Sequence, residues 1–131
     1  MIPSENILWM FDNVAMCMFP FTFTPDLFAD LLSAVTEWDI DAREVLQTGN
    51  RMVTMARLLN CRFGITKDDD VINPMKPVSG SGYFAPEKEE VLKAVEEYYH
   101  LRGWSKDGVP TRKTIEKLGI ENVKESLPSV E

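Results

Sequence analysis

The longest helical pattern in this sequence is DAREVLQTGNRMVTMARLLNCRFG, residues 41–64. Asp41, with Glu44 three residues later, resembles a capping box, in which both side chains bind backbone N–H groups at a helix N-terminus. Apolar residues then recur at the spacing of one helix face, and they are Val45, Leu46, Met52, Val53, Ala56 and Leu59. Gly64 is typical of the position just beyond a helix C-terminus. This stretch therefore predicts the longest helix of an all-α protein.

Shorter helical patterns lie on both sides of this stretch. Residues from about 4 to 18 are apolar on nearly every side, and Pro20 ends that segment. Thr24 and Pro25 suit an N-cap and a first helical position. The helix that they open has four apolar residues on one predicted face, and these are Phe28, Leu31, Leu32 and Val35.

Two more helices are expected in the second half of the chain. Pro86 opens one that Gly103 closes, and a short helix runs from Thr111 until Gly119 stops it. Between Lys67 and Tyr83 the breakers are too many for a regular element. We therefore expect one compact helical domain over residues 1–131, with about five helices, a long loop at about 65–84 and a flexible tail at about 121–131.

The composition argues against nucleic-acid binding and against a membrane span. The formal net charge is −7, whereas phosphate binding needs clustered Lys and Arg. The most apolar stretch, residues 7–20, is interrupted by Asp12 and Pro20 before the roughly 20 residues that a membrane helix needs. A secretory signal would want a basic start, which residues 1–5 lack. We therefore expect a cytoplasmic protein.

The few cysteines and the single histidine limit the chemistry that this sequence can support. Cys17 and Cys61 are too few for a disulfide framework or for a complete tetrahedral metal site. His100 falls near a predicted helix C-terminus, where a cation is favoured, and is best interpreted as an exposed or capping histidine. Any metal site therefore needs ligands from elsewhere.

Asp12 and Cys17 are unusual because a carboxylate and a thiol lie inside the most hydrophobic segment of the chain. A buried charge without a partner is unfavourable, so Asp12 should meet a hydrogen-bond donor. On the residues alone, the favoured interpretation is that Asp12 caps a turn and that Cys17 is a small core residue, as free cysteine often is. The alternative is that both side chains contact one large cofactor.

The segment around these residues resembles a motif of the aldehyde ferredoxin oxidoreductase family. Residues 12–19, DNVAMCMF, are similar to its Asp-x-x-Gly-Leu-Cys motif. Four further segments resemble the family's C-terminal region in the same order. They are residues 32–39, similar to NAVTGWD; 49–51 with 56–64, similar to GERI…RLFNVREG; 67–70, similar to RKDD; and 98–104 with 108–111, similar to YYELRGWDENGIPT. The resemblance covers about nine-tenths of the chain.

The resemblance implies roles for three residues. Cys17 matches the cysteine that supplies the fourth ligand of the family's 4Fe-4S cluster, where a thiolate is the expected ligand. Asp12 matches the aspartate that accepts hydrogen bonds from the pterin of a tungsten or molybdenum bis-pyranopterin. Met16 would contribute its backbone and apolar bulk, and no catalytic residue falls in this chain. Ala15 replaces the motif's glycine, which is unfavourable if the position needs a positive φ.

The other singled-out residues have structural interpretations. Cys61 occupies an apolar helix position and is expected to pack. Arg57, Asn60 and Arg62 match the family, and we expect them in ion pairs or loop anchors. The run at residues 68–70, DDD, lacks the ligand spacing of a calcium loop and should form a solvated turn. The larger aromatic residues are expected in the core or at an interface, and they are Trp9, Phe11, Trp38, Tyr98, Tyr99 and Trp104.

The family's other cluster ligands do not occur in this sequence. The resemblance places three cysteines in a Cys-x-x-Cys-x-x-x-Cys run far upstream. We therefore expect the chain alone to bind no cofactor, to be inactive, and to need the upstream domains or an upstream subunit. The complete enzyme would oxidise aldehydes to carboxylates and reduce ferredoxin. The family also includes members with other substrates, among them a tungsten benzoyl-CoA reductase subunit.

A second hypothesis is a catalytically inert helical module that stands alone. Residues 7–23 would then leave a large exposed apolar patch. Self-association into a homo-oligomer would cover this patch.

Overall fold

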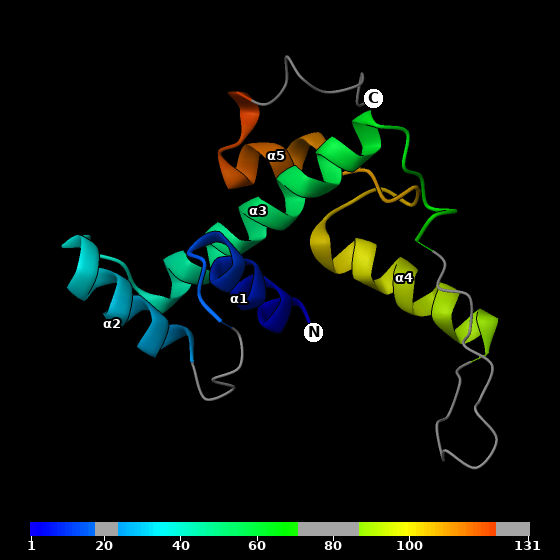
Figure 1. Cartoon of the computed structure of the whole chain (residues 1–131). Coiled ribbons are helices and arrows are strands. Elements are labelled where there is room, and N and C mark those ends of the chain that lie inside the picture. The colour runs from blue at the N-terminus through cyan, green and yellow to red at the C-terminus, as the bar shows by residue number, and fades with distance from the viewer. Residues whose placement is uncertain (18–23, 71–86, 123–131) are drawn as a thin grey trace, which may run out of the picture.

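The computed structural model describes residues 1–17, 24–70 and 87–122, and these ranges contain five α-helices (Figure 1). The helices are α1 (Ile2–Asn13), α2 (Pro25–Thr36), α3 (Ala42–Arg62), α4 (Lys88–Arg102) and α5 (Arg112–Leu118). This part of the chain has no strand, and its β-type pairing is one isolated bridge between Trp104 and Pro110. The all-α class with about five helices is therefore confirmed.

The predicted loop and tail fall largely outside the described residues. Residues 67–70 form turns, as expected for the start of the loop, whereas 71–86 and 123–131 lie outside the described ranges. A single domain over the whole chain stays a prediction.

The long helix α3 organises the fold. Figure 1 shows α1 and α2 against its first half and α5 alongside its second half. An edge-to-face pair of Phe11 and Phe28, with ring centroids 5.1 Å apart, joins α1 to α2. The buried residues around this pair are Met10, Phe11, Phe28, Ala29 and Val45. On the other half of α3, Leu58 packs with residues of α5 and the segment that follows it, which are Ile115, Leu118 and Ile120.

Side-chain N-caps are present at the two predicted positions, Thr24 and Asp41, and also at Thr111, where a helix was expected to begin. The side chain of Thr24 accepts a hydrogen bond from the N–H of Leu27 at 3.2 Å. Asp41 accepts from the N–H of Glu44 at 2.7 Å, and Thr111 caps α5 in the same way. The reciprocal half of the expected capping box is replaced, because the Glu44 carboxylate binds Arg51 instead. These caps satisfy N–H groups that a helix leaves unpaired in its first turn.

Two expectations about the apolar segments were wrong. The first helix ends at Asn13 and does not continue to Met18. The predicted face of α2 is also split, since Phe28 is buried while Leu31 is 42% exposed and Val35 is 83% exposed. The apolar pattern of α2 extends around two sides, and among the described residues only one side packs into the core. Within the described ranges, no helix is long and apolar enough to cross a membrane.

Candidate functional site

The turn after α1 brings Asp12, Met16 and Cys17 together in one short segment. The N–H of Met16 donates to the carbonyl of Phe11 at 2.9 Å, and the N–H of Ala15 donates to that of Asp12 at 3.3 Å. This pair of bonds defines a Schellman motif, in which the first residue beyond the C-cap adopts a left-handed conformation. Ala15 is that residue, with φ of 54°.

This geometry explains why a glycine and a leucine suit these positions in the family motif. A left-handed φ favours glycine, and the next residue of a Schellman motif normally makes an apolar contact back to the helix. Met16 is half-buried and packs against the core cluster that includes Phe11. The concern about Ala15 is therefore justified, because its position does require a positive φ.

Asp12 and Cys17 are both exposed at this turn, and Cys17 is a free thiol. The Asp12 carboxylate makes no hydrogen bond or ion pair to any residue that the structure describes. The interpretation of Cys17 as a core residue and of Asp12 as a side-chain cap is therefore wrong. Their roles toward a cluster and a pterin stay predictions. Among the described residues, no group of three or more His, Cys, Asp or Glu could hold a metal ion.

We expect Ala15→Gly to raise the free energy of unfolding by roughly 0.5 to 1 kcal/mol, because relief of the left-handed strain exceeds the extra backbone entropy of glycine. Urea denaturation of both proteins measures this difference. Ala34→Gly, at an exposed position inside α2, should instead lower the free energy by about 1 kcal/mol. Equal destabilisation by both changes would contradict the assigned conformation of Ala15.

Helix α1, which carries this turn, lies in direct backbone contact with α3. A Cβ atom at Gly49 would overlap the carbonyl oxygen of Asn6 and would lie 2.7 Å from its carbonyl carbon. The Asn6 side chain also donates to the carbonyl of Leu46 at 3.1 Å. The absence of a side chain at Gly49 therefore sets how closely α1 approaches α3.

A buried arginine fixes α1 to α4. The side chain of Arg102 is 0% exposed, and its guanidinium lies 2.5 Å from Glu5 in an ion pair. One nitrogen of this group donates to Asn6 at 2.7 Å and to Asn50 at 2.8 Å. Nε donates to the hydroxyl of Tyr98 at 3.1 Å. Arg102 thus joins three helices through charge-assisted hydrogen bonds.

Tyr98 completes this cluster by donating to both carboxylate oxygens of Glu5, at 3.0 and 2.8 Å. Burial and the hydrogen bond to Glu5 raise the pKa of Tyr98 to about 12. The phenol is therefore a donor at neutral pH. The sequence contained a signal for this cluster, because Arg102 continues the apolar spacing of Val91, Val95 and Tyr98 along α4.

A second ion pair anchors the turn after α3. Arg57 donates through Nε to the carbonyl of Gly108 at 2.7 Å and pairs with Asp70 at 2.6 Å. The Tyr99 hydroxyl also donates to Asp70, and Arg57 lies over the rings of Tyr99 and Trp104. The prediction that Arg57 anchors a loop is confirmed. The prediction of a wholly solvated turn at residues 68–70 was wrong for Asp70.

The environment of this pair changes three pKa values. Burial lowers the pKa of the Arg57 guanidinium, but the hydrogen bond and charge of Asp70 outweigh burial and raise it overall. Burial and Asp70 raise the pKa of Tyr99. Burial also raises the pKa of the half-buried Cys61 thiol. Asn60 and Arg62 are exposed, and their side chains contact no described partner through a hydrogen bond or ion pair.

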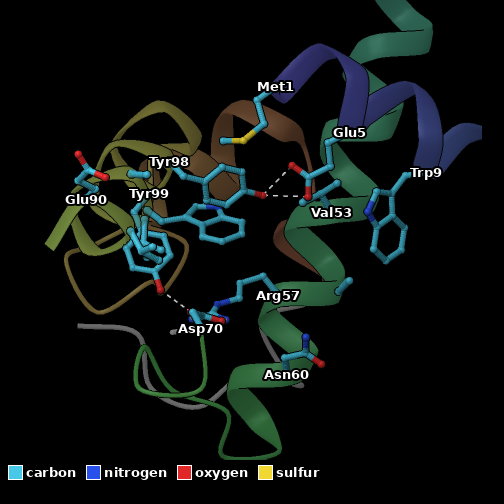
Figure 2. A pocket seen from close by; sticks show the side chains of 15 residues that line it. Met1, Glu5, Trp9, Val53, Arg57, Asn60, Asp70, Glu90, Tyr98 and Tyr99 are labelled. Carbon is cyan, nitrogen blue, oxygen red and sulfur yellow. Dashed lines mark hydrogen bonds and ion pairs between the residues drawn. The ribbon is translucent and has the colours of Figure 1, made fainter. Parts of the chain in front are cut away.

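An open groove of about 540 Å³ lies between α1, α3 and α4 (Figure 2). Its lining includes Trp9, Val53, Arg57, Tyr98 and Tyr99. Asp12, Met16 and Cys17 do not line it, so the structure separates the predicted cofactor residues from this groove.

The family model described as aldehyde ferredoxin oxidoreductase, domains 2 and 3, matches residues 1–120 of this chain. Because this match covers more than half of the chain, the chain belongs to the aldehyde ferredoxin oxidoreductase family. The tungsten-containing aldehyde ferredoxin oxidoreductases of Thermococcus kodakarensis and Pyrococcus furiosus are 30% and 29% identical to this chain over 120 residues. In both cases the match covers 88% of this chain and 20% of the relative. The chain therefore spans about one fifth of the length of these relatives.

A solved structure has a similar fold. A chain in the active-site complex of benzoyl coenzyme A reductase with 1,5-dienoyl-CoA matches with a TM-score of 0.72. The match covers 99% of this chain and 21% of that chain, at 22% sequence identity. At this identity the likeness establishes the fold.

Proposed function

We propose that this chain is the C-terminal part of a tungsten-pterin oxidoreductase that converts aldehydes to carboxylates. Overall, an aldehyde and water give a carboxylate, three protons and two electrons, and ferredoxin accepts the electrons. In this proposal Cys17 is one ligand of a 4Fe-4S cluster, and Asp12 accepts hydrogen bonds from the pterin. Membership of a family with tungsten-containing relatives supports the reaction class.

The observation that carries the proposal is the Schellman turn after α1. It ends the helix at Asn13 and leaves the Asp12 carboxylate and the Cys17 thiol exposed on adjacent parts of one segment. Met16 holds the turn against the core through its apolar side chain. An exposed thiol and an exposed carboxylate, on a turn that packs against the core, are suited to binding groups that lie outside this chain.

The residues of this chain can supply part of the cluster site and part of the pterin site. A 4Fe-4S cluster needs four thiolates, and the described residues hold no ligand group of that size. Cys17 would therefore complete a set supplied by the upstream polypeptide. Asp12 is an acceptor when ionised and suits the amino and ring N–H donors of a pterin. When bound, these groups supply the redox chemistry, and the residues of this chain hold and orient them.

The test is anaerobic co-expression of this chain with the upstream polypeptide of the Thermococcus kodakarensis enzyme. We expect Cys17→Ala to lower iron and labile sulfide in the purified complex to a small fraction of the wild-type content. Cys61→Ala is the matched control and should leave both unchanged, since Cys61 is half-buried in its own helix.

The isolated chain gives a second readout. Purified alone, it should contain neither iron nor labile sulfide, because a single thiolate cannot hold the cluster. Stoichiometric iron and sulfide in the isolated chain would contradict the proposal, and so would a full cluster in the Cys17→Ala complex.

The exposed face of α2 favours association with another protein surface. Leu27, Leu31 and Val35 recur every four residues on this helix and are all exposed. In the proposed enzyme the other domains cover this face. Sedimentation analysis of the chain, alone and mixed with the upstream polypeptide, distinguishes the enzyme hypothesis from that of an inert, self-associating module. A stable homodimer that does not bind the upstream polypeptide would support the hypothesis of an inert module. A complex of the chain with the upstream polypeptide would support the hypothesis of an enzyme part.

A further inference from the structure

The groove between α1, α3 and α4 has apolar walls built from small and aromatic side chains (Figure 2). Trp9 contributes from α1, Val53 and Ala56 from α3, and Ala94 and Val95 from α4. Ala94 is exposed and Ala56 is half-buried. Two alanines on different walls leave room for another backbone to approach closely.

Two polar contacts connect the walls of this groove. At one place Tyr98 of α4 donates to Glu5 of α1, and at another Tyr99 donates to Asp70 beside Arg57, as Figure 2 shows. These contacts fix α4 without filling the space between the helices. The groove is thus a formed feature of the fold and not a gap that side chains close.

We propose that this groove receives the apolar face of a helix from the upstream part of the same enzyme. This inference rests on the proposed function, in which an upstream polypeptide exists. The family match starts at residue 1, and the relatives are about five times as long as this match. Met1, at the start of the matched region, is one of the residues that line the groove. Helix-in-groove docking buries an apolar helix face in this way.

The chemistry of the groove favours a helix over a small ligand. Small-molecule sites normally enclose most of the ligand and place several polar groups to orient it. This groove is open, and its four charged members already have partners: Glu5 pairs with Arg102, Arg57 pairs with Asp70, and Glu90 accepts from the N–H of Glu87.

The test measures binding of the chain to the upstream polypeptide of the Thermococcus kodakarensis enzyme by titration calorimetry. Ala94→Trp fills the groove from an exposed position of α4 and should weaken binding by roughly 5- to 150-fold, which is overpacking of about 1 to 3 kcal/mol converted to a ratio of dissociation constants. Lys93→Trp adds the same side chain one residue away and outside the groove lining, and it should bind like wild type. Circular dichroism checks that both variants keep the helical fold.

Each outcome bears on the groove separately from the cofactor roles. Unchanged binding by Ala94→Trp would overturn the docking proposal, even if the complex still contains iron and sulfide. Weakened binding without iron in the wild-type complex would support docking and contradict the role of Cys17. If the wild-type chain does not bind the upstream polypeptide, both the docking proposal and the proposed role of Cys17 are contradicted. Loss of dimerisation on Ala94→Trp, with binding unchanged, would assign the groove to a second copy of this chain and overturn the proposal.

Discussion

Arg102→Met should lower the free energy of unfolding by about 3 kcal/mol, the lower end of the range for breaking a buried ion pair. The guanidinium of Arg102 is fully buried, whereas Glu5 is 32% exposed and can recover some solvation. Methionine fills similar volume but donates no hydrogen bond, so Glu5, Asn6 and Asn50 each lose a donor. Because domains are stable by only about 5 to 15 kcal/mol, this loss should leave a clearly weakened protein.

Urea denaturation of the isolated chain, followed by circular dichroism, measures this effect. Arg112→Met is the matched control, because Arg112 is 75% exposed and pairs with Glu116 one turn away. Surface pairs of this kind contribute about 0.2 to 1 kcal/mol. Similar losses in the two variants would show that Arg102 does not hold α1 and α4 together.

The helices could be predicted from sequence where the signals are local. Thr24, Asp41 and Thr111 cap helices because each side chain reaches an N–H group of its own first turn. Gly103 and Gly119 end helices because each adopts a left-handed φ. In such cases the residues that decide the boundary are neighbours in the chain.

The end of α1 could not be predicted, because it depends on an alanine in a conformation that its propensity does not favour. Ala15 is a good helix former, yet it terminates α1 with a positive φ. Burial of Met16 against the core stabilises this turn from outside the helix. The family resemblance identified the position as a glycine site, whereas composition and periodicity did not.

The ion pairs of Asp70 and Arg102 also could not be predicted from the local sequence. Asp70 is the last of three acidic residues that look solvated, and it meets Arg57 and Tyr99 only because α3 and α4 come together there. Arg102 meets Glu5 across most of the chain. A charge on an apolar stripe indicates a buried partner, but it does not identify that partner.

Gly49→Ala should lower the free energy of unfolding by about 3 kcal/mol, the upper end of the range for overpacking. The added methyl group would overlap the backbone of Asn6, which is held within α1 and cannot rotate away as a side chain could. Alanine gains about 1 kcal/mol of helix propensity over glycine, and the net loss includes this compensation. Gly64→Ala is the control, since its Cβ meets nothing within 4 Å and only the left-handed backbone, with φ of 88°, opposes it by about 1 kcal/mol.

Gly49→Ala also tests whether the position of α1 determines the position of the Asp12–Cys17 turn. If Gly49 sets the approach of α1 to α3, Gly49→Ala should speed amide hydrogen exchange through α1 and the Asp12–Cys17 turn more than in α5. Gly64→Ala should leave exchange in α1 unchanged, because Gly64 lies beyond the other end of α3. In the reconstituted complex, Gly49→Ala should then lower iron content although Cys17 is intact. Unchanged exchange in α1 with lowered iron would mean that Gly49 acts on the cluster site by a route other than the α1–α3 contact.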